Sequence, residues 1–440
     1  MLLVKIRRII EMRVMPAGLF ICCVLILTTS CGRAPMKEAN QAMRLTKGPE
    51  TLADDLPLDE FAKGMEENIV RLNRLNIQSL NFGPKVVSKD DYILALNYLV
   101  GQIKSGASKN NFMETVARHF EFYEVYGKDG WGEVLITSYF HPVIPGSITK
   151  TSRYSQPLYS VPPDLVNIRL DEFVKNLETL SPIKDQVLGQ TSLLGVLRGR
   201  LVSSENGTAS NVLPYYTREE IESKQVLEGQ NLEFAWVDPV DAFFLQIQGS
   251  GTVRFEDGEK LRLGYAAKNG HPFIGISKYL SDVIPVERMS MQAVDGYLRQ
   301  LPEDEMKRIL NKNPSYVFFR ILEGKPVTSL GAEVVDGRTI ATDPSFFPKG
   351  ALAYMEFPKP VFKDEASIEP IGWEPTSRLV LDQDTGGAIR GPYRVDLYWG
   401  SGKEAGRHAG VMKERGRLYY LVPKDGFLEE LARENGLKKE

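Results

Sequence analysis

Acidic residues near the carboxy terminus are the side chains of this sequence best suited to chemistry. Asp384 and Asp396 stand in "LDQDTGGAIRGPYRVDLYWG", residues 381–400, beside glycines and aromatic residues rather than in a run of like charges. Two acids in a polar, aromatic-lined cleft can cleave a glycosidic bond, because one donates a proton and negative charge faces the developing oxocarbenium ion. An aspartate in "DTGG" is also a common turn residue that bonds its own backbone, so composition alone leaves both interpretations open.

Metal, nucleotide and nucleic-acid chemistry find little support in the sequence. The four histidines are scattered without ligand spacing, and no phosphate-binding loop, dinucleotide fingerprint or nucleophile elbow is present. With 54 Lys and Arg against 57 Asp and Glu, the formal charge of −3 gives no global basic field. We therefore expect no metal, no cofactor and no nucleic-acid partner.

The amino terminus, residues 1–31, has the pattern of a lipoprotein signal peptide. A basic region precedes an apolar stretch, residues 15–28, that is too short for a comfortable membrane span, and "LTTSC" ends at Cys31. The pattern resembles a bacterial lipobox with Cys31 as the lipidated residue. A plain signal peptide with an incidental Cys stays open, because Leu27 lies four rather than three positions before the Cys. Gly32 in place of an aspartate predicts, by analogy with Gram-negative lipoproteins, an outer-membrane anchor facing the periplasm.

All three cysteines lie in this signal segment, so we expect no disulfide and no thiol catalyst in the mature body. The length of 440 residues exceeds what one hydrophobic core usually spans, which predicts two domains. A flexible tether is expected over residues 32–51, and a change to Pro, Tyr and Ser after residue 145 indicates a domain boundary.

Local patterns predict the elements that must position the acids. Before the boundary we expect three helices and a strand. The helices cover residues 61–72, the segment that follows a cap at Ser88, and residues 110–120, and the strand covers 132–140. After it we expect a helix capped by Thr217, a strand-rich piece over 242–255, a turn at Asp257-Gly258 with a return strand to Tyr265, and short helices over 275–284 and 290–300. From residue 313 to Val422, short strands between Gly and Pro turns, with no long helix, predict a small β-barrel.

The acids also carry a resemblance to a known family. "ATDPSFFPKGALAYM", "LDQDTGGAIRG" and "RVDLYWG" resemble the three-aspartate (3D) domain, whose acids fall on Asp343, Asp384 and Asp396. Upstream, "SYFHPVI", "YSQPLYSVPP", "FFLQIQGSGTV", "YAAKNGHPFIGI", "MSMQA" and "NPSYVFFR" resemble, in the same order, the membrane-bound lytic murein transglycosylase A family. One position departs from the family pattern. His141 stands in "SYFHPVI" where the family has a hydroxyl residue, so one expected contact in the groove is in doubt.

The resemblance implies a mainly β fold with amino-terminal helices. A double-psi β-barrel domain is expected from residues 52–145 and 321–425, with a second β-barrel domain, residues 146–320, inserted, and residues 426–440 as a tail. The glycan would lie in a groove between the two domains, lined by aromatic faces and amides. The candidates for this groove are Tyr139, Tyr154, Gln156, Gln248, Ser250, Tyr265, Lys268 and Asn269, each of which could instead serve the fold.

The implied reaction cleaves the β-1,4 bond between N-acetylmuramic acid and N-acetylglucosamine of peptidoglycan without water, giving a 1,6-anhydro product. The family motif places the single acid and base on Asp396, whose neighbours Val395, Leu397, Tyr398 and Trp399 are expected to favour its neutral form. Asp384 would hold charge or position Asp396, and Asp343 would brace a loop. A non-catalytic, lipid-anchored glycan-binding protein and a muramidase-type hydrolase remain alternatives. Exo or endo action, the role of peptide stems and any partners among cell-wall synthesis proteins stay open.

Overall fold

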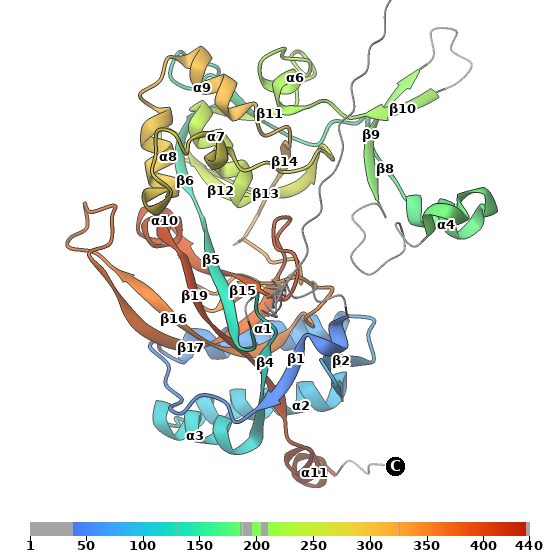
Figure 1. Cartoon of the computed structure of the whole chain (residues 1–440), viewed down its shortest axis with the longest axis vertical. Coiled ribbons are helices and arrows are strands. Elements are labelled where there is room, and N and C mark those ends of the chain that lie inside the picture. Colours follow the sequence, from blue (N-terminus) through green and yellow to red (C-terminus); the bar gives the residue numbers. More distant parts are fainter. Residues whose placement is uncertain are drawn as a thin grey trace, which may run out of the picture. The chain divides into compact units, whose positions relative to one another are not determined.

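Strands from both ends of the chain close one barrel in the computed structural model, which describes residues 38–128, 130–184, 187, 196–203, 210–324 and 326–436. The ring runs from β5 through β18, β15, β17, β16 and β19 back to β5, with β4 and β1 extending the sheet from β19 (Figure 1). The strands are β1 (Met43–Thr46), β4 (Phe120–Val125), β5 (Glu133–His141), β15 (Thr339–Ala341), β16 (Ala351–Val361), β17 (Gly372–Asp384), β18 (Arg394–Ser401) and β19 (Lys413–Pro423).

The direction of the strands decides which residues lie side by side in this barrel. β18 is parallel to β5, and β15 is parallel to β17. The other neighbours in the ring are antiparallel. The central strands are buried on both faces, because the barrel interior and the covering helices enclose them; in β17 all six residues of "RLVLDQ", 378–383, are buried, including the three polar ones.

Helices from the two ends of the chain cover this first barrel. They are α1 (Asp59–Arg74), α2 (Lys89–Lys104), α3 (Lys109–His119), α10 (Gly402–Val411) and α11 (Asp425–Glu434), with a small hairpin of β2 (Ser79–Phe82) and β3 (Lys85–Ser88). The predicted cap is confirmed, since Ser88 Oγ accepts from Asp91 N at 3.1 Å. The predicted tail contains α11, whose buried Phe427 packs against the rings of Tyr98 and His119.

A second barrel lies between β5 and β15 in the sequence. Its sheet order is β14-β13-β12-β6-β11-β7, and a bridge between Ser160 and Phe319 joins the two ends. Its core contains Leu158, Val237 and Val253. The strands are β6 (Val143–Ser147), β7 (Gln156–Tyr159), β11 (Glu233–Val237), β12 (Ser250–Arg254), β13 (Lys260–Lys268) and β14 (Val317–Ile321).

Further elements surround the second barrel. A three-stranded sheet of β8 (Leu165–Ile168), β9 (Leu197–Ser203) and β10 (Ser210–Pro214) accompanies α4 (Leu170–Asn176). The other helices are α6 (Arg218–Glu222), α7 (Pro239–Gln248), α8 (Met291–Leu298) and α9 (Glu303–Leu310), and 3-10 turns lie at η2 (Glu178–Ile183), η3 (Ile276–Tyr279) and η4 (Val286–Arg288). A further 3-10 turn, η1 (Ala39–Gln41), precedes β1 of the first barrel. The predicted capping box at Thr217 is present.

Three local predictions are wrong in part. The strand-rich piece expected over 242–255 is a strand only in β12, from Ser250 to Arg254. Residues 239–248 form α7, because Asp238 caps the helix, Pro239 starts it and Gly249 ends it at φ 78°. The expected helix over 275–284 is reduced to the 3-10 turn η3. In the carboxy-terminal third the expectation of short strands is wrong, because β17 reaches 13 residues, whereas α10, with 10 residues, fits the expectation of no long helix.

Candidate active site

Strand order brings Asp384 and Asp396 to opposite sides of one residue. β15 lies between β17 and β18, and its last residue, Ala341, is paired with Asp384 on one side and with Asp396 on the other. Neighbouring strands lie about 4.8 Å apart, so the two backbones are roughly 10 Å apart across β15. The two acids therefore share one end of the barrel, and the charge of Asp384 reaches Asp396.

Asp396 is held by two side chains that the sequence did not identify as site residues. Thr137, its parallel neighbour on β5, donates a hydrogen bond from Oγ1 to Asp396 Oδ1. Arg394 contacts both carboxylate oxygens, from Nε at 3.1 Å and from Nη2 at 3.3 Å. Arg394 Nε also donates to Thr137 Oγ1 at 3.0 Å, so the three side chains form one connected group.

The pKa of Asp396 is raised above its ordinary value. Burial is the largest cause, and the charge of Asp384 adds to it, while Arg394 and Thr137 act in the opposite direction. A raised pKa is what a proton donor needs. Of the neighbours expected to surround the Asp396 carboxyl, however, two do not. Val395 and Leu397 are buried on the other face of β18, because side chains alternate along a strand.

Asp384 accepts hydrogen bonds on both of its oxygens. Tyr139 Oη donates to Oδ2 at 2.9 Å, and the backbone amides of Ser329 and Thr385 each donate to Oδ1 at 2.9 Å. Burial and the Asp384 charge raise the pKa of Tyr139 well above its ordinary value, so its hydroxyl stays protonated as a donor. Asp384 thus lies among neutral hydrogen-bond donors, whereas Asp396 has the charged Arg394 beside it.

Asp343 lies in a turn after β15 and is 4% exposed. Its Oδ1 accepts from Ser345 N at 3.0 Å, and its Oδ2 accepts from Gly391 N at 2.8 Å. Gly391 has φ 78°, a conformation that favours glycine, and it belongs to the loop between the two other acids. These contacts give Asp343 the geometry of a brace for that loop.

Three of the predicted groove residues lie next to the end of β5. Gln248 Oε1 accepts from Phe140 N at 3.1 Å, and Ser250 Oγ lies 3.2 Å from His141 Nδ1. Tyr265 is 45% exposed and lies beside Gly249. Because Tyr139 is on the same strand as Phe140, the structure brings these residues to the neighbourhood of the acids.

His141 replaces the expected hydroxyl residue without leaving an unpaired polar group. Besides the Ser250 contact, its Nε2 lies 2.9 Å from Thr252 Oγ1. Burial lowers the pKa of His141 to about 4, with a smaller effect of the Arg262 charge. The imidazole is therefore neutral at physiological pH and ties β5 to β12.

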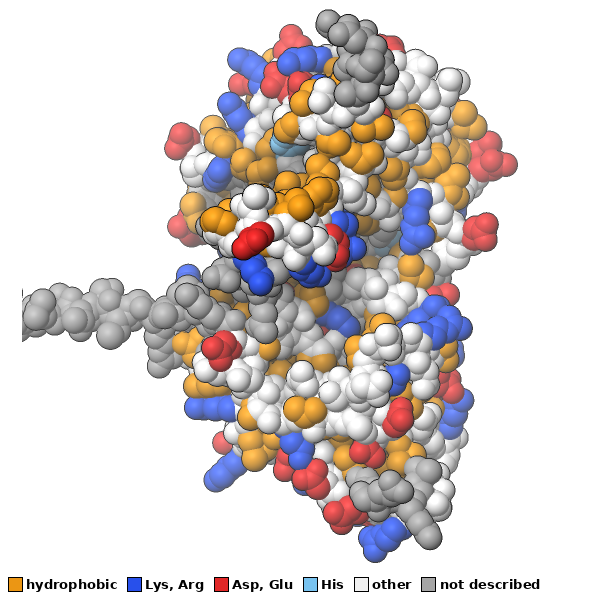
Figure 2. Space-filling model, turned by 90° about the vertical axis from the view of Figure 1, so that its right-hand side faces the viewer, with side chains coloured by type: hydrophobic (Ala, Val, Ile, Leu, Met, Phe, Trp, Pro, Cys, Tyr) orange, Lys and Arg blue, Asp and Glu red, His pale blue; other side chains and the backbone are white. Residues whose placement is uncertain are grey.

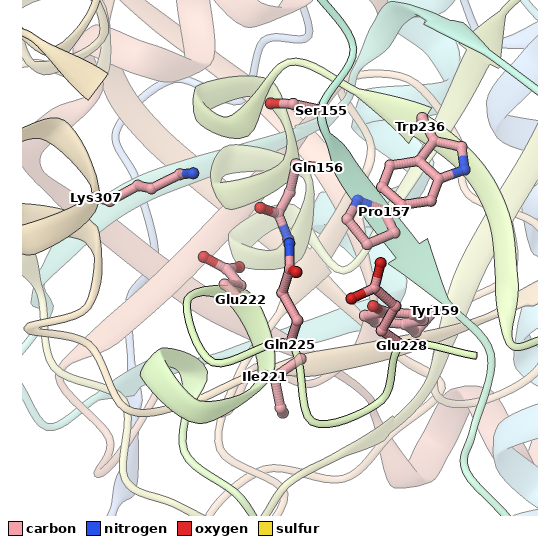
Figure 3. Close-up of a pocket in the computed structure, with 10 residues that line it drawn as sticks. All are labelled: Ser155, Gln156, Pro157, Tyr159, Ile221, Glu222, Gln225, Glu228, Trp236 and Lys307. Atoms are coloured by element: carbon pink, nitrogen blue, oxygen red, sulfur yellow. The ribbon is translucent and has the colours of Figure 1, made fainter. Parts of the chain in front are cut away.

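The other three predicted groove residues with little exposure are Tyr154, Gln156 and Asn269, all of which are buried. Asn269 is 1% exposed, donates to Tyr216 O and Pro314 O, and accepts from the Tyr316 amide. Tyr154 is 6% exposed. Gln156 lies in a pocket with Trp236, Glu222 and Lys307 (Figure 3), and its amide nitrogen has no hydrogen-bond partner among the described residues.

The described residues do not include Cys31, the signal segment 1–31 or residues 32–37 of the tether, so these predictions lie outside them. Part of the expected tether is ordered, since β1 pairs with β4 in the barrel sheet. Within the described ranges, every helix is too short or too polar to cross a bilayer.

The chain is similar to two described families and to curated proteins. Residues 135–320 match the "MltA specific insert domain", and residues 338–422 match the "3D domain". "Membrane-bound lytic murein transglycosylase A" of Escherichia coli K12 is 30% identical over 312 residues, 69% of this chain and 70% of that protein. The protein of the same description from Vibrio cholerae is 29% identical over 302 residues, 67% of each chain.

Solved structures share the fold. The crystal structure of a membrane-bound lytic murein transglycosylase from Agrobacterium tumefaciens has a TM-score of 0.64 at 26% identity and covers 89% of this chain and 99% of that chain. The crystal structure of E. coli MltA with bound chitohexaose has a TM-score of 0.63 at 24% identity, and the match covers 87% of this chain and 95% of that chain. The predicted class, a double-psi β-barrel with a second β-barrel inserted, is confirmed, and the chain belongs to the membrane-bound lytic murein transglycosylase A family.

Proposed function

We propose that this chain is a lytic transglycosylase that cleaves the glycan strands of peptidoglycan. The family assignment supports the enzyme class. The bond would be the β-1,4 link between N-acetylmuramic acid and N-acetylglucosamine, and the product a 1,6-anhydromuramoyl end. The observation that carries the proposal is the placement of Asp396 and Asp384 on either side of Ala341, in two different settings.

Asp396 would act first as acid and then as base. Its carboxyl proton goes to the glycosidic oxygen as the bond from that oxygen to C1 breaks, and the N-acetylglucosamine leaves with the proton. The C6 hydroxyl oxygen of the muramoyl sugar then bonds to C1, and its proton returns to the Asp396 carboxylate. The raised pKa of Asp396 supports the first step, because it favours the protonated form.

The other residues of the site would position the acid and balance charge. Arg394 and Thr137 fix the orientation of the Asp396 carboxyl through their hydrogen bonds. Asp384, held by Tyr139, would face the oxocarbenium ion that develops at C1, so its negative charge stabilises the transition state. Asp343 would act through the loop that it braces rather than on the sugar.

The glycan would follow the end of β5 and the neighbouring wall of the second barrel. We propose Tyr139, Gln248, Ser250, Tyr265 and Lys268 for sugar contacts, and keep Tyr154 and Gln156 for sugars farther from the acids. Asn269 is left out, because its amide is fully used by the backbone. Residues 146–320 would form the glycan-binding domain, with 52–145 and 321–425 forming the catalytic one.

We further propose that the protein is a lipoprotein of the outer membrane, facing the periplasm and anchored through Cys31. The description of the E. coli relative as membrane-bound supports an association with the cell envelope. Glycan strands would be its main partner, and cell-wall synthesis proteins would be further partners.

Product analysis tests the reaction. Purified protein is incubated with peptidoglycan sacculi, and the released fragments are examined by mass spectrometry. Anhydro ends support the transglycosylase. Reducing ends would identify a muramidase-type hydrolase, and binding without release would identify a non-catalytic glycan-binding protein.

A further inference from the structure

Three cationic side chains gather near the proposed active site without an acidic partner. Arg198 lies on β9, Lys268 ends β13, and Arg390 belongs to the loop that Asp343 braces. In the described part of the chain, no carboxylate lies within ion-pair distance of any of the three. On the face shown in Figure 2, Lys and Arg side chains lie around its recessed middle.

Contacts of neighbouring residues fix the backbone that carries Arg198 and Arg390. The Cβ of Arg198 lies 2.8 Å from where a Cβ would stand on Gly270, so β9 packs directly against the turn that follows Lys268. The loop that carries Arg390 is tied down on both sides of that residue, because Gly391 N donates to Asp343 Oδ2 at 2.8 Å and Arg394 Nη1 donates to Ala388 O at 3.2 Å. The cations are thus presented by the fold.

The charges of Arg198 and Arg390 both act on Lys268. Burial, followed by the charges of Arg198 and Arg390, lowers the pKa of Lys268, and no carboxylate contributes to its environment. Like charges held together destabilise a fold unless an anion neutralises them. The arrangement therefore resembles a site that is completed by a ligand with negative charge.

We infer that Arg198, Lys268 and Arg390 bind a carboxylate on the 3-O-lactyl arm of the muramoyl sugar. This inference rests on the proposed function, because it assumes that a peptidoglycan strand lies beside the acids. The carboxylate is either that of the lactyl group itself or one in the peptide that the arm carries. A neutral chitin-like strand has the same backbone and lacks this group, so the site distinguishes peptidoglycan from chitin.

Equilibrium binding of the full chain, carrying Asp396→Asn to prevent cleavage, tests the site. The probes are chitohexaose, peptide-free glycan strands and strands with peptide stems. Arg198→Gln and Arg390→Gln are compared with Lys260→Gln, which removes a charge from the other end of β13. We expect each arginine change to lower affinity for the anionic strands about five- to tenfold more than for chitohexaose. The Lys260 change should leave the ratio unaltered, and added salt should reduce it in the parent.

The pattern of loss identifies the carboxylate. In stem-bearing strands the lactyl carboxyl is bonded to the peptide as an amide and carries no charge. A loss only with peptide-free strands therefore assigns the lactyl carboxylate, a loss only with stem-bearing strands assigns a peptide carboxylate, and a loss with both shows that the site accepts either carboxylate. Equal effects on all three probes, or none, would overturn the inference. A parent protein that binds the strands with this preference but releases no anhydro product would contradict the proposed function and leave the carboxylate site supported.

Discussion

Replacing Asp396 by Asn tests the proposed acid and base directly. The change keeps the size of the side chain, and Oδ1 can still accept from Thr137 and Arg394. The amide nitrogen takes the place of Oδ2, so the 3.3 Å hydrogen bond from Arg394 Nη2 is lost. The amide carries no proton that it can transfer, and we expect a folded protein that binds glycan without cleaving it.

The expected increase in the activation free energy is much larger than the free energy of the lost Arg394 hydrogen bond. General acid–base catalysis by one group contributes about 10²–10⁴ in rate, or about 2.7–5.5 kcal/mol in the activation free energy. The lost Arg394 contact involves a side chain that is 27% exposed, and such pairs contribute about 0–1 kcal/mol. Because both proton transfers rest on one carboxyl group, we expect a loss near the upper end of the catalytic range.

The assay is the release of 1,6-anhydromuropeptides from sacculi, with circular dichroism as a control for folding. Chitohexaose binding serves as a control for the groove, and Asp343→Asn is the matched variant at an acid that does not face the sugar. If Asp396→Asn retains more than about a tenth of parental activity, the loss is too small for a sole acid. The assignment then fails, and Asp384 becomes the leading candidate.

Four further outcomes are expected. Asp384→Asn should lower the rate of release about ten- to a hundredfold, because its proposed role is electrostatic, and a loss as large as that of Asp396→Asn would contradict this role. Asp343→Asn should lower the free energy of unfolding in denaturant by about 1–3 kcal/mol, because it leaves a partly buried backbone amide, that of Ser345 or Gly391, without its acceptor; unchanged stability would argue against the brace. Cys31→Ala should move the protein from the membrane to the soluble fraction, because each buried acyl methylene contributes about 0.8 kcal/mol, whereas retention in the membrane would place the anchor elsewhere. Finally, a carboxyl group whose pKa is raised by folding stabilises the fold below its unfolded pKa, about 3.9, and loses that contribution as pH rises through the folded value. Asp396→Asn should thus melt above the parent at pH 7 and close to it near about pH 4, and a lower midpoint at pH 7 would contradict the raised pKa.

Local signals predicted well those elements whose ends are set by neighbouring residues. Ser88 and Thr217 begin helices as expected, because a cap depends on a contact only three residues away. The wrong prediction over 242–248 has a physical cause. α7 is buried around most of its circumference, so its apolar residues do not recur with the helical period. In the sequence, such a short apolar run cannot be distinguished from a buried strand. Asp238 and Gly249 were the signals that could have identified it.

The residues around Asp396 could not be found from its own segment. Thr137 lies 259 positions away in the sequence and reaches Asp396 only because β5 and β18 pair in the closed barrel. Arg394 was within reach of a pattern argument, because residues two apart on a strand share a face. The same alternation excludes Val395 and Leu397 from the surroundings of the Asp396 carboxyl.

β5 connects the chemistry with the proposed glycan wall. Thr137 contacts Asp396, Tyr139 contacts Asp384, and the next amide, that of Phe140, donates to Gln248 on the second barrel. A slip of one residue in the pairing of β5 with β18 would turn Thr137 and Tyr139 to the opposite face of the sheet. The acids and the wall are therefore held in register by one strand, so the cleaved bond is positioned by the contacts that hold β5 in place.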